Sequence, residues 1–443
     1  MPKEYIDVPN SLCYKDLIPN FRKISIFQRN NFHSLLSIAI SSPCAMSHHY
    51  ISTATELRHL LCQLQDCPVI AYDTEFISEN HYYPQLCLVQ IAASEIQALI
   101  DPFSVGSLNA FWELLCDGRH EIVVHACRSE MEFCFRAINR LPTKLFDVQV
   151  AAGFLGNDYP AGYGTLLERF LKISLPKAES RTVWNKRPLT ALQIEYALGD
   201  VHYLEQLAQT LQTHLVAQKR IDWYTAEMER IKQKLQYSFE TPRWRSLPKI
   251  STLKPRELAI ARELWFWRET IAQKRNLPAS RVLRDDLVVE IARRGTSDEK
   301  RIAAVRGMQR SDAPKILPEI SAAINRALAI PQEKCPLPSD RFSFPQYSVM
   351  AQLLFATLCS ICQRHRISPQ LVGGAGDIRE LIAAELGTLP PEINPRLLDG
   401  WRAELVGSLL GDLINGQTFI QIERNTPENP FVFVRNQTTP DFT

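Results

Sequence analysis

The sequence predicts an α/β domain followed by two smaller helical domains. Between about residues 50 and 215, short apolar runs alternate with segments of helical periodicity, a pattern typical of a sheet flanked by helices. Two later segments are helical, and Pro-bearing polar stretches precede each of them, as in interdomain joints. The predicted parts are an α/β domain at 48–215, a linker at 216–250, helical domains at 251–330 and 340–425, and a tail at 426–443.

The elements of the predicted α/β domain follow from local signals. Cap-type Ser and Thr residues open a helix at 52–57, and helical spacing of apolar residues continues at 128–138 and 165–171. A long helix is predicted at 190–211. At 146–149 another element begins, and Asp147 is interpreted as its structural cap rather than as a metal ligand. Short apolar runs predict strands at 69–73, 86–92, 98–101 and 121–125.

The remainder of the chain is predicted to be mostly helical. A charged helix is expected at 219–234, and further helices lie within 255–307, 350–363, 378–385 and 400–407, before short strands at 418–422 and 431–434. Cys359 and Cys362 share the apolar helix and have no second pair at zinc-site spacing, so we interpret them as packed thiols.

Composition excludes several classes of protein. The 443 residues carry a formal net charge of +2, so any nucleic-acid contact must depend on local patches. The 11 Cys follow no secreted-domain framework, and no apolar run reaches the ~20 residues of a membrane span. We therefore expect a cytoplasmic protein with no membrane partner. Residues 1–47 lack a clear period and are expected to be disordered, or to come from an over-extended start codon.

Acidic residues at both ends of the α/β domain predict a metal site. Asp73 and Glu75 are two residues apart in a strand and project to one face. Tyr196 and Asp200 are four residues apart in a helix and also share a face. Carboxylates brought together repel, and Mg²⁺ or Mn²⁺ compensates such repulsion with oxygen ligands. Two such ions, about 3.5–4 Å apart, form the usual clamp for attack on a phosphodiester.

Four ordered motifs resemble those of the ribonuclease D family. The resemblance covers roughly residues 50–420 and implies a ribonuclease H-like 3′→5′ exonuclease domain with catalytic acids and a catalytic tyrosine. The motifs are Asp73-Thr-Glu-Phe with Tyr82-Tyr-Pro-Gln-Leu, the segment from His125-Ala, the run Glu179-Ser-Arg-Thr-x-Trp with Arg187-Pro-Leu-Thr, and Tyr196-Ala-x-x-Asp-Val-x-Tyr-Leu.

One position departs from the family pattern. The family places an Asp five residues after the motif-two His, and here that position is Glu130. Glu130 still offers a carboxylate, and we favour it as the ligand of a second metal; a loosened site is the competing outcome. Glu132, the other nearby acid, lies about 200° away around the helix.

The resemblance also implies roles for individual residues. Asp73 bridges two cations, Glu75 and Asp200 complete the first site, and Glu130 serves the second, while Tyr196 orients the attacking water. His125 is expected to pack or hydrogen-bond beneath the site. The basic loop that contains Arg181, Lys186 and Arg187 is a candidate for binding substrate phosphate. A solvated loop is the alternative for Lys186 and Arg187.

The two helical domains resemble HRDC domains. The run from Arg268 to Val288 carries this resemblance, and residues 254–307 hold thirteen Lys and Arg against eight Asp and Glu. This excess suits backbone phosphates, although an ordinary solvated bundle is the alternative. Residues 340–425 resemble a second, more divergent HRDC-like domain.

Three functions remain open at this point. The first is a metal-dependent exoribonuclease, favoured as a monomer, that trims structured RNA such as tRNA precursors and releases 5′-nucleoside monophosphates. The second is a 3′→5′ DNA exonuclease, because the residue that would read the 2′-OH is not visible. The third is a nucleic-acid-binding protein whose nuclease activity was lost through Glu130.

Overall fold

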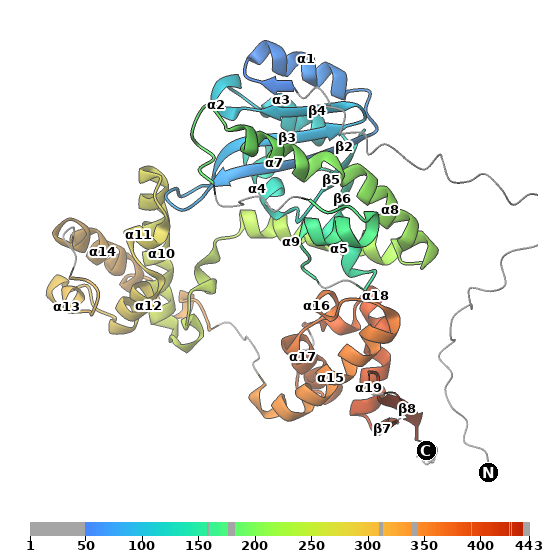
Figure 1. Cartoon of the computed structure of the whole chain (residues 1–443). Coiled ribbons are helices and arrows are strands. Elements are labelled where there is room, and N and C mark those ends of the chain that lie inside the picture. The colour runs from blue at the N-terminus through green and yellow to red at the C-terminus, as the bar shows by residue number, and fades with distance from the viewer. Residues whose placement is uncertain are drawn as a thin grey trace, which may run out of the picture.

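The computed structural model describes residues 49–156, 159–175, 182–309, 313–338, 344–390, 392–424, 426 and 428–436. The predictions for residues 1–47 and for Arg181 lie outside these ranges. The described chain forms an α/β domain and two helical units (Figure 1).

The α/β domain is built on a six-stranded mixed sheet. Its order is β1-β4-β3-β2-β5-β6, with β2–β3 and β3–β4 antiparallel and the other pairs parallel. The central strand β2 extends to Ile77, beyond the end predicted from the apolar run, and β1 was not predicted. The strands are β1 (His49–Ile51), β2 (Val69–Ile77), β3 (Gln85–Ala93), β4 (Ile96–Ile100), β5 (Glu121–Val124) and β6 (Leu145–Asp147).

Helices cover the sheet on both faces. Tyr72 of β2 packs edge-on against Phe111 and Trp112 of α3, while α7 packs against β3, β4 and β2. The helices are α1 (Ala54–Leu64), α2 (Pro102–Val105), α3 (Asn109–Leu115), α4 (Arg128–Ile138), α5 (Val148–Gly153), α6 (Tyr163–Leu166) with a π-helical turn Leu167–Leu171, α7 (Ala191–His202) and α8 (Leu204–Ala217).

The prediction of a single helix at 190–211 is wrong, because the structure has two helices that meet at Tyr203. There the backbone leaves the helical region, with φ −106° and ψ 5°. The Tyr203 N–H also lies 3.3 Å from the Tyr163 hydroxyl, which accepts a hydrogen bond from it. This partner outside the helix stabilises a break that apolar periodicity does not reveal.

The predicted linker contains the 20-residue helix α9 (Ile221–Glu240), which packs on the α/β domain. Tyr224 of α9 is buried and its hydroxyl accepts a hydrogen bond of 2.8 Å from the Asp147 N–H. Two short 3₁₀ turns, Arg243–Ser246 and Ile250–Thr252, then lead to the first helical unit.

The first helical unit has a hydrophobic core of its own. Leu258, Leu264 and Ile291 are among its fully buried residues. In Figure 1 it stands apart from the C-terminal unit. Its helices are α10 (Pro255–Arg275), α11 (Ala279–Val282), α12 (Asp285–Arg294), α13 (Glu299–Ala303) and α14 (Ala313–Leu328).

The C-terminal unit shares a continuous core with the α/β domain. Trp401 packs against Phe154 at 4.9 Å and stacks on Trp223 of α9 at 5.7 Å between ring centroids. Cys362 is buried and Cys359 is half-buried, and both are free thiols, as predicted. The elements are α15 (Ser348–His365), α16 (Pro369–Val372), α17 (Ala375–Glu385), α18 (Gly400–Arg402), a π-helical turn Ala403–Gly407, α19 (Ser408–Ile414) and the strands β7 (Thr418–Ile422) and β8 (Phe431–Arg435), which pair antiparallel.

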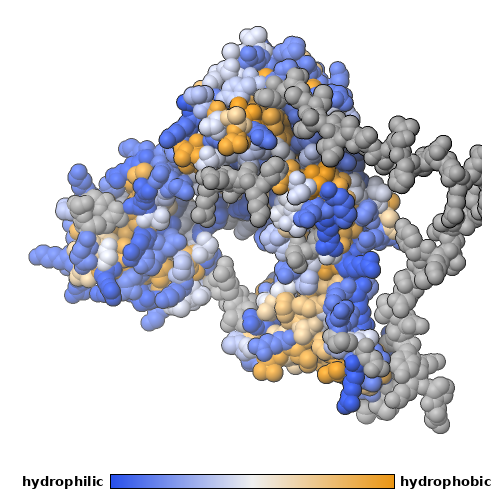
Figure 2. All heavy atoms as spheres, viewed as in Figure 1, coloured by the Kyte–Doolittle hydropathy of each residue, from blue (hydrophilic) through white to orange (hydrophobic). Residues whose placement is uncertain are grey.

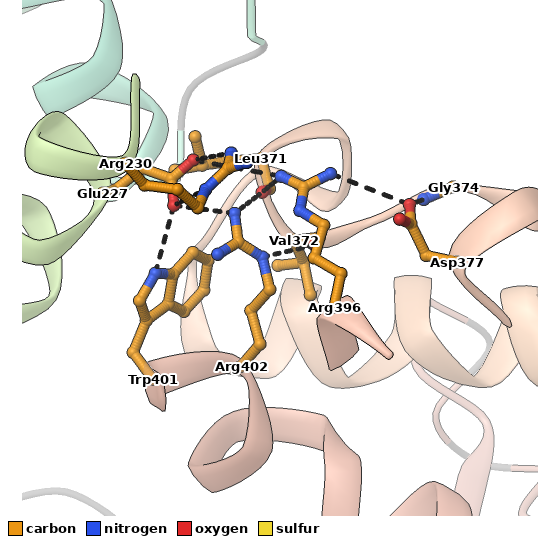
Figure 3. A network of polar contacts seen from close by, with 9 residues as sticks. All are labelled: Glu227, Arg230, Leu371, Val372, Gly374, Asp377, Arg396, Trp401 and Arg402. Atoms are coloured by element: carbon orange, nitrogen blue, oxygen red, sulfur yellow. Dashed lines mark hydrogen bonds and ion pairs between the residues drawn. The ribbon is translucent and has the colours of Figure 1, made fainter. Parts of the chain in front are cut away.

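A buried ionic network joins α9 to the C-terminal unit (Figure 3). The side chains of Glu227 and Arg402 are each only 2% exposed and lie 2.8 Å apart. Arg230 also pairs with Glu227, and the Trp401 indole donates to it at 3.4 Å. Arg402 donates further to the carbonyls of Val372 and Leu371 at 2.7 and 2.9 Å. These bonds satisfy a charge that would otherwise be costly to bury.

The surface differs between the two helical units. Figure 2 shows a mostly hydrophilic face on the first unit and a hydrophobic patch over the C-terminal unit. Exposed apolar residues on α15 include Val349 and Leu353, at 82% and 55% exposure. Among the described residues, none of the helices combines the length and apolar character needed to cross a bilayer.

Glu227→Gln should lower the free energy of unfolding by about 3 kcal/mol, because it leaves Arg402 and Arg230 without a buried counter-charge. The matched control is Glu229→Gln on the same helix, whose exposed pair with Lys232 should contribute under about 1 kcal/mol. Urea unfolding of both variants measures the difference. Equal losses would show that the buried network does not hold the two parts together.

The wild-type contribution of Glu227 should also depend on pH. Burial opposes ionisation, but the Arg230 and Arg402 guanidinium groups hold the pKa of Glu227 below its ordinary value. Stability from this group is therefore present above the unfolded-state pKa of about 4.3 and is lost as the pH falls through the lower folded-state pKa.

Candidate active site

Strand β2 carries the first two acidic residues at the middle of the sheet. Tyr72 and Thr74 are buried, while the alternate residues Asp73 and Glu75 are half-buried and project to the other face. The register with β3 shifts between Glu75 and Phe76, which is a bulge or irregularity. The residue that the ladder skips is Cys87, so the extra residue lies on β3, and Glu75 is the last β2 residue paired before it.

Helix α7 brings Tyr196 and Asp200 to the same face of the sheet. Thr190 begins the helix with a capping box, in which its hydroxyl accepts from the Gln193 N–H and the Gln193 side chain accepts from the Thr190 N–H. The Tyr196 ring lies 6.0 Å from the Trp184 ring. These contacts fix the rotation of α7 over β2 and β3.

The pKa values of three carboxyl groups indicate that they lie close together. Burial, followed by the charges of Asp73 and Asp200, raises the pKa of Glu75 to about 8. Burial and then the Asp73 charge raise the pKa of Asp200 to about 8, although the Tyr196 hydroxyl lowers it. Burial also raises the pKa of Asp73. Two of the three groups therefore tend to retain protons at neutral pH.

Glu130 approaches Asp73 from helix α4. It is 4% exposed, and its Oε1 atom accepts a hydrogen bond of 3.0 Å from the Thr74 hydroxyl. Its Oε2 atom is buried and has no partner among the described residues. Burial and then Asp73 raise the pKa of Glu130 well above its ordinary value. Glu132 is half-buried and interacts with Arg136 instead.

His125 and Asp147 form hydrogen bonds with backbone groups next to the site. The His125 Nε2 atom lies 2.9 Å from the Ala161 carbonyl, which confirms the expectation that it hydrogen-bonds. Asp147 caps α5 through the Gln149 N–H at 2.8 Å, as interpreted from the sequence. It also accepts from the N–H groups of Ala126 and Cys127, at 3.1 and 2.9 Å. Asp147 thus fixes the turn that leads into α4 and Glu130.

The donor set fits a hard divalent cation. Asp73, Glu75, Glu130 and Asp200 offer carboxylate oxygens, and Glu130 has a buried oxygen without a partner. In the described ranges, no three His, Cys, Asp or Glu side chains already converge tightly enough to hold a metal ion. The charge of Asp73 raises the pKa values of Glu75, Asp200 and Glu130 after burial, so Asp73 is a neighbour of all three carboxyl groups.

The basic loop before α7 divides into two kinds of residue. Lys186 is exposed at the surface. Arg187 points inward and donates to Asp101 at 2.6 and 2.8 Å, to the Cys87 carbonyl at 2.7 Å, and to the Trp184 and Lys186 carbonyls at 2.9 and 3.0 Å. These five contacts use its five N–H donors, so it is held as an anchor of the loop rather than presented to phosphate.

Two residues near the site escaped the reading of the sequence. The Tyr163 ring lies 5.8 Å from the His125 ring, and its hydroxyl accepts a hydrogen bond from the Tyr203 N–H. In the sequence, only the Gly-rich segment around Tyr163 distinguishes this position. Gln90 lies directly opposite Asp73 in the β2–β3 register and is fully buried. Neither end of its amide has a partner in the part of the chain that the structure describes. Buried amides usually have partners.

Gln90→Met should leave the metal-free protein as stable as wild type or up to about 1 kcal/mol more stable, because an unpaired buried amide is costly. Gln97→Met is the control, since the Gln97 amide lies 2.6 Å from His202 Nδ1 and its loss should destabilise by about 1 kcal/mol. Thermal unfolding in EDTA measures both. A larger loss for Gln90→Met than for Gln97→Met would show that the Gln90 amide is paired in solution.

Comparison with known proteins agrees with this architecture. A family profile described as 3′-5′ exonuclease matches residues 48–216, and the HRDC domain profile matches residues 257–324. The ribonuclease D of Nitrobacter hamburgensis is 33% identical over 380 residues, which cover 84% of this chain and 97% of that protein. The ribonuclease D of Escherichia coli is 29% identical over 83% of this chain and 99% of its own length.

The fold is also similar to a solved structure. The crystal structure of Escherichia coli RNase D, described as an exoribonuclease involved in structured RNA processing, matches with a TM-score of 0.74 and 28% identity over 84% of this chain and 99% of that one. The first helical unit is thus the HRDC domain, and it follows a ribonuclease H-like exonuclease domain in the sequence. The chain belongs to the ribonuclease D family of divalent-metal-dependent 3′→5′ exoribonucleases.

Proposed function

We propose that this protein trims the 3′ ends of structured RNA, such as tRNA precursors, by hydrolysis with two divalent cations, Mg²⁺ or Mn²⁺. The observation that carries the proposal is the gathering of four carboxyl groups at β2: Asp73 and Glu75 share one face of the strand, α7 with Asp200 packs against the strand, and Glu130 accepts a hydrogen bond from the intervening Thr74. This arrangement suits a carboxylate that bridges two cation sites.

Each acidic residue has a defined role in the proposal. Asp73, Glu75 and Asp200 would hold the first cation, and Asp73 and Glu130 would hold the second. Bound divalent cations supply a more acidic water and stabilise the leaving 3′ oxygen. Glu130 is buried and the other three carboxylates are half-buried, which strengthens their interaction with a cation.

Tyr196 orients the attacking water in this proposal. Burial and then Asp200 raise the pKa of Tyr196 well above its ordinary value, so its phenol stays protonated at neutral pH. A neutral phenol is a hydrogen-bonding group rather than a general base there. Lys186, on the surface of the loop before α7, and Arg181, five residues earlier in the sequence, are proposed contacts for substrate phosphate.

The proposal is tested with a 3′-tailed tRNA precursor labelled at its 5′ end, with Mg²⁺, Mn²⁺ or EDTA. Wild type should give a metal-dependent ladder that shortens from the 3′ end. Asp200→Asn and Glu130→Gln should each lower the rate by at least about 100-fold, because each removes a charged ligand. Glu132→Gln is the matched control on α4 and should stay within about twofold of wild type.

Other outcomes would favour the remaining functions. Equal degradation of a DNA strand of the same sequence would remove the preference for RNA. RNA retention without shortening by wild type, with activity gained by Glu130→Asp, would mean that Glu130 has turned the scaffold into a binding protein. Glu130→Gln with full activity would contradict the role given to Glu130.

The metal-free protein should become less stable as the pH rises from about 5 to 8. The folded-state pKa values of Glu75 and Asp200 are about 8, above the unfolded values near 4, so the folded state binds more protons across this window. Mn²⁺ should reverse the trend, because it displaces those protons. Thermal unfolding across this pH range, with Mn²⁺ or EDTA, measures both slopes. A flat profile in EDTA for wild type, identical to that of Asp200→Asn, would contradict the mutual repulsion.

A further inference from the structure

The connection between β2 and β3 touches the HRDC domain. In Figure 1 this connection points toward α10 and α11. The Tyr82 hydroxyl donates to Glu269 Oε2 of α10 at 2.6 Å, and the Gln273 side chain lies 3.3 Å from the same hydroxyl. Asn276, at the end of α10, accepts from the Tyr82 N–H at 3.2 Å. Arg281 of α11 donates to Asn80. Residues 78–84, here called the β2–β3 loop, are thus held from outside the α/β domain.

The same loop also contacts the helix that carries Glu130. Tyr83 lies edge-on to Tyr82, with ring centroids 4.6 Å apart. The Arg136 guanidinium of α4 lies 3.5 Å from the centre of the Tyr83 ring, a close cation–π contact. Phe76, one residue before the end of β2, packs edge-on against Phe133 of α4, with ring centroids 5.5 Å apart. The loop therefore lies between the HRDC domain and α4.

The loop begins close to Glu75. The β2–β3 ladder skips Cys87 of β3 after Glu75 and then continues through Phe76 and Ile77, where the loop starts. The strand end that follows Glu75 is thus continuous with the loop. Contacts that hold the loop therefore also restrain Glu75 on β2 and Glu130 on α4.

We propose that Tyr82 is a positioning residue, whose hydroxyl fastens the β2–β3 loop to the HRDC helix α10 and thereby holds the carboxylates of β2 and α4 in their catalytic arrangement. The HRDC domain then contributes to the chemical step as well as to RNA binding. Tyr82 touches no reacting atom in this proposal and acts through the loop. The hydrogen bond from the Tyr82 hydroxyl to the Glu269 carboxylate is expected to be strong, because its acceptor is charged and the Glu269 side chain is only 13% exposed.

The test compares Tyr82→Phe with Tyr83→Phe in the full-length chain. Tyr82→Phe keeps the ring and removes the hydroxyl that binds Glu269, whereas Tyr83 is 42% exposed and contacts Arg136 through its ring, which Phe preserves. The substrate is a 5′-labelled single-stranded RNA of about five nucleotides. Tyr82→Phe should lower kcat about three- to tenfold and change KM less than twofold, because misplaced carboxylates weaken the transition state rather than ground-state binding. Tyr83→Phe should leave both constants within twofold of wild type.

Hydrogen exchange supplies a readout that does not depend on turnover. Amides of the β2–β3 loop should exchange on the order of tenfold faster in Tyr82→Phe than in wild type or Tyr83→Phe, because a charge-assisted hydrogen bond is lost. Glu269→Gln retains an acceptor for the Tyr82 hydroxyl and should lie between wild type and Tyr82→Phe in both readouts. Faster loop exchange with unchanged kcat would overturn the proposal and leave a purely structural contact. A rise in KM alone would also overturn it, since the hydroxyl would then serve RNA binding.

Discussion

The structure depends on the mutual repulsion of carboxylates around Asp73. Glu75, Asp200 and Glu130 each gain part of their raised pKa from this one residue, and burial supplies the largest part. A folded chain without cations must keep protons on some of these groups, which makes the site a poor structural element by itself. The same repulsion favours divalent cations, because a cation converts unfavourable neighbours into ligands. The free energy that holds these carboxylates together must therefore come from contacts elsewhere in the fold.

Those contacts are polar and lie at the ends of secondary-structure elements. Asp147 holds the turn before α4, the capping box of Thr190 begins α7, and Arg187 joins the loop before α7 to Asp101 at the end of β4. Each contact fixes the origin of an element rather than its middle. A small error at the origin of a helix moves a side chain two turns along it, so these contacts determine where the carboxylates meet.

Much of the catalytic sheet could be predicted from sequence, because short apolar runs bounded by polar turns specify strands without reference to the rest of the fold. Spacing predicted that Asp73 and Glu75 share a face of a strand and that Tyr196 and Asp200 share a face of a helix, and the family resemblance joined the two pairs into one expected site. The break at Tyr203 and the inward position of Arg187 could not be predicted, because their partners, Tyr163 and Asp101, are 40 and 86 residues away. Gln90 escaped because an apolar strand with one amide resembles an ordinary buried strand.

The two helical units are attached to the α/β domain by different interactions, and this difference limits how each can influence catalysis. The C-terminal unit shares a hydrophobic core with the exonuclease domain and adds the buried pair of Glu227 and Arg402, so its displacement would expose apolar surface and an ion pair together. The HRDC domain has a separate core and meets the β2–β3 loop through hydrogen bonds and through the Tyr82 ring, which packs against that core. Water can replace such hydrogen bonds at modest cost, so the HRDC domain is attached to the sheet more weakly than the C-terminal unit. The contacts of the β2–β3 loop with α10 and α4 are therefore the route by which the HRDC domain is connected to Glu75 and Glu130, whereas the C-terminal unit is connected through a shared core.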